Sequence, residues 1–183
     1  MPPARSNAFE VLFQHPWRTI MVADTRQTLE KLLHSFSTAM LVTRSVDGTL
    51  RSRPMAIARV DQTDDVWFVT DIESGKVDEI DSDPVVNVAL QNGSQYVSLS
   101  GTAAIIQDRM LLEEMWQEAW RVWFPKGKDD PNISLLRVRT IEGEYWDNSG
   151  QQGLKYLFEA GKAYLTGTRP AIDEDVHQKV DLR

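Results

Sequence analysis

The sequence contains no cysteine and only three histidines, His15, His34 and His177, among its 183 residues. Without cysteine the chain has no disulfide framework, no thiolate nucleophile, and no Cys-ligated zinc or iron–sulfur cluster. The histidines lie far apart in the sequence, which disfavours a Ser-His-Asp triad and heme ligation. The side chains alone therefore offer little redox or nucleophilic chemistry.

Basic residues are also scarce, with 20 Lys and Arg against 27 Asp and Glu and a formal net charge of −7. Nucleic acids bind to basic surfaces, so we expect no nucleic-acid partner. No apolar run approaches the ~18 residues of a membrane span, and no signal-peptide pattern is present. We therefore expect a cytoplasmic protein without a membrane partner. Common phosphate-loop, hydrolase and zinc-protease motifs are missing, and no metal site is predicted.

In other respects the chain has the composition of an ordinary globular protein, with 42% hydrophobic residues. Its length suits one domain. Residues 1–20 are set apart, because residues 10–14 resemble part of a protease site used in expression vectors. They could equally be native sequence upstream of a start at Met21. We predict a folded domain over residues 21–167 and a flexible C-terminal tail over residues 168–183.

The secondary-structure pattern is mostly β. Apolar spacing predicts a helix from Thr28, capped by Asp24 or Thr25, and a second helix from Asp108 through Trp120. We predict strands at residues 39–43, 49–60, 66–70, 85–90, 96–106 and 134–140, a short helix at 76–80, and a helix or strand at 154–160. Asp47-Gly48 favours a hairpin, and Gly101 a bend. Six strands with inserted helices predict a mainly β fold, a six-stranded antiparallel barrel with helices packed at its ends.

Two arginines on the second strand form the first candidate site. Strand alternation places Arg51, Arg53 and Met55 on one face, and Pro54 suggests an edge or bulge where a ligand could approach. In an acidic protein, paired arginines favour an anion-binding site. The alternative is an exposed strand face whose arginines pair with nearby carboxylates.

The second candidate site lies where the third strand ends and a short helix begins. Ser74, Gly75 and Lys76 would bring free backbone amides, a hydroxyl and an ammonium to one place, which suits a phosphate monoester. The alternative is simple helix capping by Ser74, with Lys76 in solvent. Because the second and third strands are hairpin neighbours, both candidate sites are expected on one side of the sheet.

These segments carry a family resemblance. Arg53-Pro54-Met55, Phe68-Val69-Thr70 and Ser74-Gly75-Lys76 resemble, in order and spacing, the pyridoxamine 5'-phosphate oxidase-like family of FMN-binding split barrels. Residues 123–131, 135–138 and 144–147 are similar to its bacterial general stress protein branch. The resemblance implies a split β-barrel of Greek-key type and a homodimer with FMN, rather than FAD or a deazaflavin, held where two barrels meet.

The resemblance also implies a set of flavin contacts. The implied residues are Arg53, Pro54 and Met55 beside the flavin, partly through backbone groups; Val69 and Thr70 at the ring and phosphoribityl chain; Ser74 and Lys76 at the phosphate; Tyr96 where the oxidases have Gln; and Trp123 and Phe124 from the partner subunit.

The sequence departs from the oxidases at several positions. Ala58 stands where they have Lys, Gly75 stands where they have Arg, and their C-terminal substrate-binding Arg and His pattern is missing. We therefore do not expect pyridoxamine phosphate oxidation, and no catalytic residue is assigned. The sequence leaves three hypotheses. The first is a flavin-binding stress-response protein with flavin-dependent oxidoreductase activity, and the second is a non-catalytic flavin or deazaflavin storage module. The third is a ligand-free interaction domain, in which Arg51 and Arg53 would pair with protein carboxylates and leave no open cleft.

Overall fold

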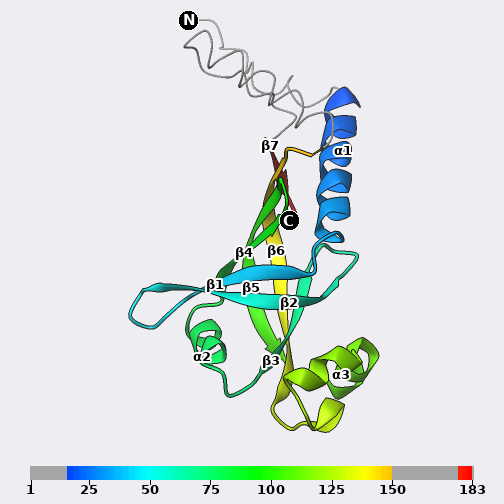
Figure 1. Ribbon diagram of the computed structural model, residues 1–183. Coiled ribbons are helices and arrows are strands. Elements are labelled where there is room, and N and C mark those ends of the chain that lie inside the picture. Colours follow the sequence, from blue (N-terminus) through cyan, green and yellow to red (C-terminus); the bar gives the residue numbers. More distant parts are fainter. Residues whose placement is uncertain (1–15, 150–176, 183) are drawn as a thin grey trace, which may run out of the picture.

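The described chain contains seven strands and three α-helices, and Figure 1 shows their arrangement. The structure is a computed structural model that describes residues 16–149 and 177–182. In chain order the elements are α1 (Pro16–Leu33), β1 (Thr38–Arg44), β2 (Leu50–Val60), β3 (Val66–Asp71), α2 (Gly75–Ser82), β4 (Val85–Asn92), β5 (Gln95–Ile106), α3 (Arg109–Met115), the 3-10 turns η2 (Glu118–Val122) and η3 (Gly127–Asp129), β6 (Ile133–Asp147) and β7 (His177–Asp181).

Strands β1 to β6 close into an antiparallel barrel, which confirms the predicted fold class. The strand order is β3-β2-β1-β4-β5-β6-β7, and an additional β3–β6 pairing joins the ends of the six-stranded part. The spatial order β4-β1-β2-β3 is that of a Greek key. The β1–β2 hairpin turns at Gly48, whose φ of 85° suits a residue without Cβ.

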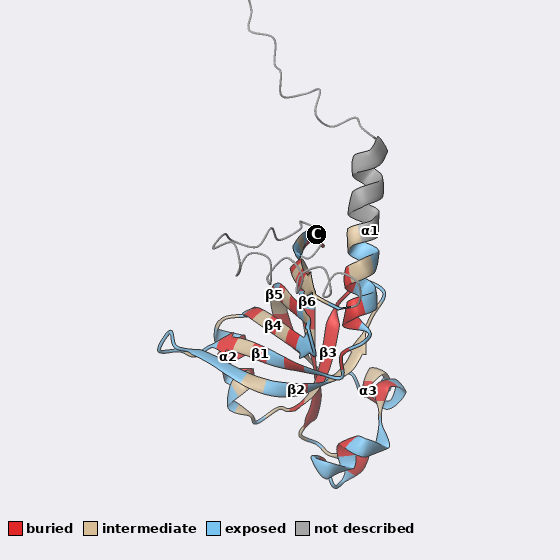
Figure 2. Ribbon diagram, turned by 45° about the horizontal axis from the view of Figure 1, so that its top comes forward, coloured by how far each residue is buried: buried red, intermediate tan, exposed pale blue. Residues whose placement is uncertain are grey.

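Alternation along the strands separates two hydrophobic clusters. The main core fills the barrel and includes Leu41, Phe68 and Leu99, each fully buried, and is covered at one end by Leu29 and Leu33 of α1. The smaller cluster lies between the barrel and the α3–η3 segment and includes Trp67, Trp120 and Leu135. In Figure 2, buried positions follow the barrel strands, whereas the tip of the β1–β2 hairpin is exposed. The buried polar side chains include Thr43, Thr70 and Glu79, and also Asp64, Asp65 and Thr140.

Gly101 confirms the predicted irregularity in β5. The β5–β6 register shifts between Ser100 and Gly101, and a Cβ at Gly101 would meet the Arg139 carbonyl oxygen at 2.2 Å. The close approach of the β6 backbone therefore requires glycine at this position.

Three sequence predictions are wrong in detail. Helix α1 begins at Pro16, so Asp24 and Thr25 lie inside it and the proposed boundary after residue 20 falls within a helix. Helix α3 ends at Met115, because Trp116 takes φ −54° and ψ 132° and leaves the helix; Trp120 lies on η2 instead.

The third correction concerns the predicted flexible tail. Residues 177–181 form β7, which pairs with residues 142–146 of β6 and buries Val180 and Leu182 against the main core. Packing of these apolar side chains explains why this part is ordered. The predicted element at 154–160 lies outside the described residues.

Candidate functional site

The junction between β3 and α2 is held by a tight set of backbone contacts. The Ile72 amide donates to the Asn132 carbonyl at 2.8 Å, and the Glu73 amide donates to Asp71 Oδ1 at 2.8 Å. Ser74 occupies the N-cap position of α2, but its hydroxyl does not cap the helix; it donates to the Asp71 carbonyl at 2.7 Å. The interpretation of Ser74 as a side-chain cap is therefore wrong.

Lys76 folds back over this junction instead of extending into solvent. Its Nζ donates to Thr70 Oγ1 and to Ser74 Oγ, each at 2.9 Å, and the two hydroxyl oxygens lie 3.2 Å apart. Thr70 is buried, and Lys76 is half-buried. We call Thr70, Ser74 and Lys76 the hydroxyl–lysine cluster. It brings Ser74 and Lys76, which the sequence assigned to a phosphate, together with Thr70, which the resemblance placed at the ring and phosphoribityl chain.

Arg53 lies next to this cluster and is held from behind by Glu79 of α2. Arg53 Nη2 contacts Glu79 Oε2 at 2.5 Å and Thr43 Oγ1 at 2.9 Å, while Thr43 Oγ1 also donates to Glu79 Oε2 at 2.5 Å. Arg51 Nη1 contacts the other carboxylate oxygen of Glu79 at 3.3 Å. The alternative interpretation of the arginine face, pairing with a protein carboxylate, is confirmed.

The electrostatics of the site follow from these contacts. Burial and the neighbouring Arg53 charge lower the pKa of Lys76, against the opposing effect of Asp71 and Glu79. Burial acts to raise the pKa of Glu79, but the hydrogen bonds from Thr43 and Arg53 and the charges of both arginines outweigh it and hold that pKa below its ordinary value. Glu79 is therefore an anion inside the site, and Lys76 is a cation with another cation beside it.

The start of α2 has room for an approaching group. A Cβ added to Gly75 would meet no heavy atom within 4 Å. The first amides of a helix have no partner within the helix and carry its positive dipole end. The eight-residue helix thus adds backbone donors beside Lys76. Together with two hydroxyls and the ammonium, this donor set fits the phosphate of a phosphorylated ligand.

Pro54 and Tyr96 lie on the other face of the sheet from Arg53. They line a cleft of ≈ 360 Å³ on the outer face of the barrel, together with Met40 and Trp146. Pro54 is opposite Met40 in the β1–β2 ladder, and Tyr96 is opposite Trp146 in the β5–β6 ladder. Neither Arg51 nor Arg53 lines this cleft, and both pair with Glu79, as the ligand-free hypothesis predicted.

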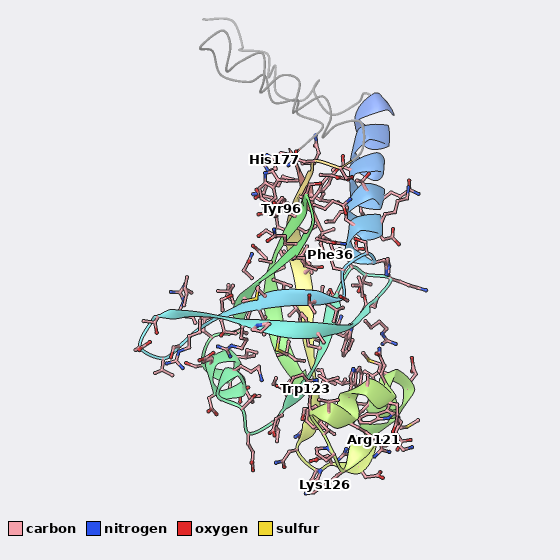
Figure 3. All side chains as sticks on the ribbon, in the orientation of Figure 1. Phe36, Tyr96, Arg121, Trp123, Lys126 and His177 are labelled. Carbon is pink, nitrogen blue, oxygen red and sulfur yellow. The ribbon has the colours of Figure 1, made fainter. Side chains whose placement is uncertain are left out.

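The remaining predicted contacts are spread over the molecule. The side chains of Met55 and Phe124 are buried in the two hydrophobic clusters, and Val69 packs against the smaller one. Trp123 is 74% exposed. Figure 3 shows Trp123 and Arg121 at the α3 end of the molecule, and Tyr96 toward the opposite end with His177. One chain therefore does not bring Tyr96 and Trp123 together.

Sequence reasoning missed Glu79 and Thr43. Glu79 is 5% exposed and Thr43 is 1% exposed, and both contact Arg53. A signal was present for Glu79, which stands one helical turn after Lys76 and so shares its side of the helix. Thr43 is a residue on the inward face of β1 and gave no signal of its own.

Two further observations apply to the described ranges, 16–149 and 177–182. No helix there is both long and apolar enough to cross a bilayer. Nor do three or more His, Asp or Glu side chains of these ranges gather where they could hold a metal ion.

A Greek-key barrel closed by β3 and β6, with a polar junction at the start of α2, defines a split-barrel protein. The sequence model described as "Pyridoxamine 5'-phosphate oxidase like" matches residues 24–171. The chain therefore belongs to the pyridoxamine 5'-phosphate oxidase-like family, as its resemblance implied.

Known proteins of similar sequence or structure agree with this assignment. Protein bli-3 of Neurospora crassa is 31% identical over 141 residues, which cover 67% of this chain and 68% of that protein. A structure assigned to general stress protein 26 of Jannaschia sp. CCS1 is similar with TM-score 0.66 and 26% identity, covering 87% of this chain and 99% of the other. The general stress FMN/FAD binding protein of Xanthomonas citri has TM-score 0.60 and 25% identity, covering 69% and 92%.

Proposed function

We propose that the protein binds a flavin, FMN, with the phosphate at the hydroxyl–lysine cluster. The observation that carries the proposal is the convergence of Lys76 Nζ, Thr70 Oγ1 and Ser74 Oγ within 3.2 Å of one another. The Lys76 ammonium has no ion-pair contact within residues 16–149 and 177–182 and lies beside the Arg53 charge, so the arrival of a dianion stabilises it. The Xanthomonas citri relative, described as an FMN/FAD binding protein, supports a flavin as the ligand class.

A second copy of the chain completes the proposed site. The cleft beside Pro54 and Tyr96 is on the outer face of the barrel, and Tyr96 and Met40 each remain 39% exposed there. Trp123, 74% exposed, is also a large aromatic without cover. Exposed aromatic and apolar groups of this kind are typical of interfaces. We propose a homodimer in which the ring of the flavin lies between the outer faces of two barrels, with Trp123 contributed by the partner.

The flavin would supply the redox chemistry, and the chain would bind and orient it. Among the residues that line the cleft beside Pro54, Tyr96 is the one titratable side chain. This scarcity of proton donors favours the storage module as a second candidate. Steady-state oxidation of NADH or NADPH with an added acceptor distinguishes the candidates, because a storage module gives no protein-dependent rate whereas an oxidoreductase does.

Phosphate recognition gives the first testable prediction. FMN is expected to bind at least about tenfold more tightly than riboflavin, because charge-assisted hydrogen bonds to the phosphate contribute roughly 1.5–3 kcal/mol. Titration of the purified protein with each flavin, followed by fluorescence, measures the two affinities. Inorganic phosphate should compete with FMN and leave riboflavin binding unchanged. Equal affinity for both flavins, or binding of neither, contradicts the proposal.

A further inference from the structure

Glu79 occupies an unusual place for a carboxylate in an anion site. Its side chain is 6% exposed, whereas that of Arg53 is 21% exposed and that of Arg51 is 58% exposed. Exposure therefore increases outward from Glu79 to the two arginines. A ligand that arrives from solvent meets the guanidinium groups first, and Glu79 lies behind them.

This order means that Glu79 does not compete with a ligand for Arg53. Moving the carboxylate away from its arginines would leave a buried charge without a partner, which is strongly unfavourable. The pair is further locked by Thr43, which donates to Glu79 and accepts from Arg53. The Glu79–Arg53 contact is therefore expected to persist when an anion binds.

The contact also fixes which edge of the guanidinium is available. Both hydrogen bonds of Arg53 to Glu79 and Thr43 use Nη2. A guanidinium carries five N–H donors in a rigid plane, so Nε and Nη1 remain to face a ligand. An arginine held this way loses less conformational entropy on binding than a free one.

We propose that Glu79 is a positioning residue that holds Arg53 toward the ligand phosphate, with Thr43 as the second support. The proposal rests on the proposed function, since it assigns a role in recognising the same phosphate. It predicts that neutralising this carboxylate weakens the binding of a phosphorylated ligand, although removal of a negative charge alone would strengthen the binding of an anion.

The test compares FMN and riboflavin affinities of Glu79→Gln, Thr43→Val and the control Asp78→Asn. Asp78 is an exposed carboxylate on the same helix, so its substitution makes the same charge change away from Arg53. Glu79→Gln should raise the Kd for FMN about five- to tenfold, and Thr43→Val about two- to threefold, the range expected when one immobilised side chain becomes free. The affinity of all three variants for riboflavin should stay within about twofold of the wild-type value, since riboflavin lacks the phosphate.

Three outcomes overturn the proposal: tighter FMN binding by Glu79→Gln, FMN binding unchanged in both variants, or equal losses for FMN and riboflavin. The last would mean a structural role only. If Glu79→Gln does not fold, the Thr43→Val variant tests the proposal, because it keeps the charges of both Glu79 and Arg53. A wild-type protein that binds FMN no better than riboflavin contradicts the proposed function, whereas a wild-type phosphate preference that neither variant changes contradicts only the role of Glu79.

Discussion

Replacement of Asp65 by Ala is expected to lower the free energy of unfolding by about 3 kcal/mol, because it breaks a buried ion pair. Asp65 is 2% exposed and lies at the turn between β2 and β3. Its Oδ2 accepts from Arg137 Nη2 at 2.6 Å and from Arg137 Nε at 2.8 Å, and its Oδ1 accepts from the Thr140 amide at 3.0 Å.

The size of this effect follows from what the substitution leaves behind. Arg137 would keep its charge without a carboxylate, and a buried backbone amide would lose its acceptor. Arg137 is 39% exposed, so water compensates part of the loss and the expected value lies at the lower end for buried pairs. The same guanidinium lies over the ring of Trp67, 5.4 Å from its centroid, so packing against the smaller cluster would loosen as well.

Thermal unfolding measures the prediction. A loss of about 3 kcal/mol corresponds to a decrease in Tm of roughly 6–12 °C for a chain of this size. Asp129→Ala, an exposed carboxylate on η3, is the control and should leave Tm unchanged. Asp65→Asn should lose less, because its carbonyl can still accept from the Thr140 amide. A Tm of Asp65→Ala equal to that of the control would show that the pair contributes nothing.

The barrel strands could be predicted because their signals are local. Alternation along β1 puts Ala39 and Leu41 inward, and Asp47-Gly48 supplies the turn that joins β1 to β2. The bulge at Gly101 has a tertiary cause, the close approach of β6. It could still be predicted, because a glycine within a strand is by itself a sign of a bulge. For β7, by contrast, pairing depends on the far half of β6 and on the cover that Leu29 provides.

The candidate site also has one part that local sequence signals predict and another that depends on tertiary contacts. Ser74 and Lys76 are two positions apart, so a strand followed by a helix start was enough to suggest a cluster. The Arg53–Glu79 contact joins residues 26 positions apart, and no local pattern assigns a partner across that distance. From the sequence, the arginines were expected to face either an anion or a carboxylate. The structure shows the carboxylate, and it leaves Lys76 as the cation without an ion-pair contact among the described residues.

This division sets the expectation for Lys76→Met, a substitution that removes the ammonium and keeps most of the apolar stem. We expect the Kd for FMN to rise about 10- to 100-fold, because a charge-assisted hydrogen bond contributes roughly 1.5–3 kcal/mol. Riboflavin affinity should not change. The matched control is Lys31→Met on α1, an exposed lysine that should leave both affinities at the wild-type value.

Stability should change in the opposite direction to affinity. The pKa of Lys76 is lowered by burial and by Arg53, so its charged form is disfavoured in the folded protein relative to the unfolded chain. At neutral pH the ammonium therefore opposes folding, and this opposition fades as pH rises through the folded-state pKa. The Tm of flavin-free Lys76→Met at pH 7 should equal or exceed that of the wild type. A lower Tm together with unchanged FMN affinity would mean that Lys76 supports the fold and not the ligand.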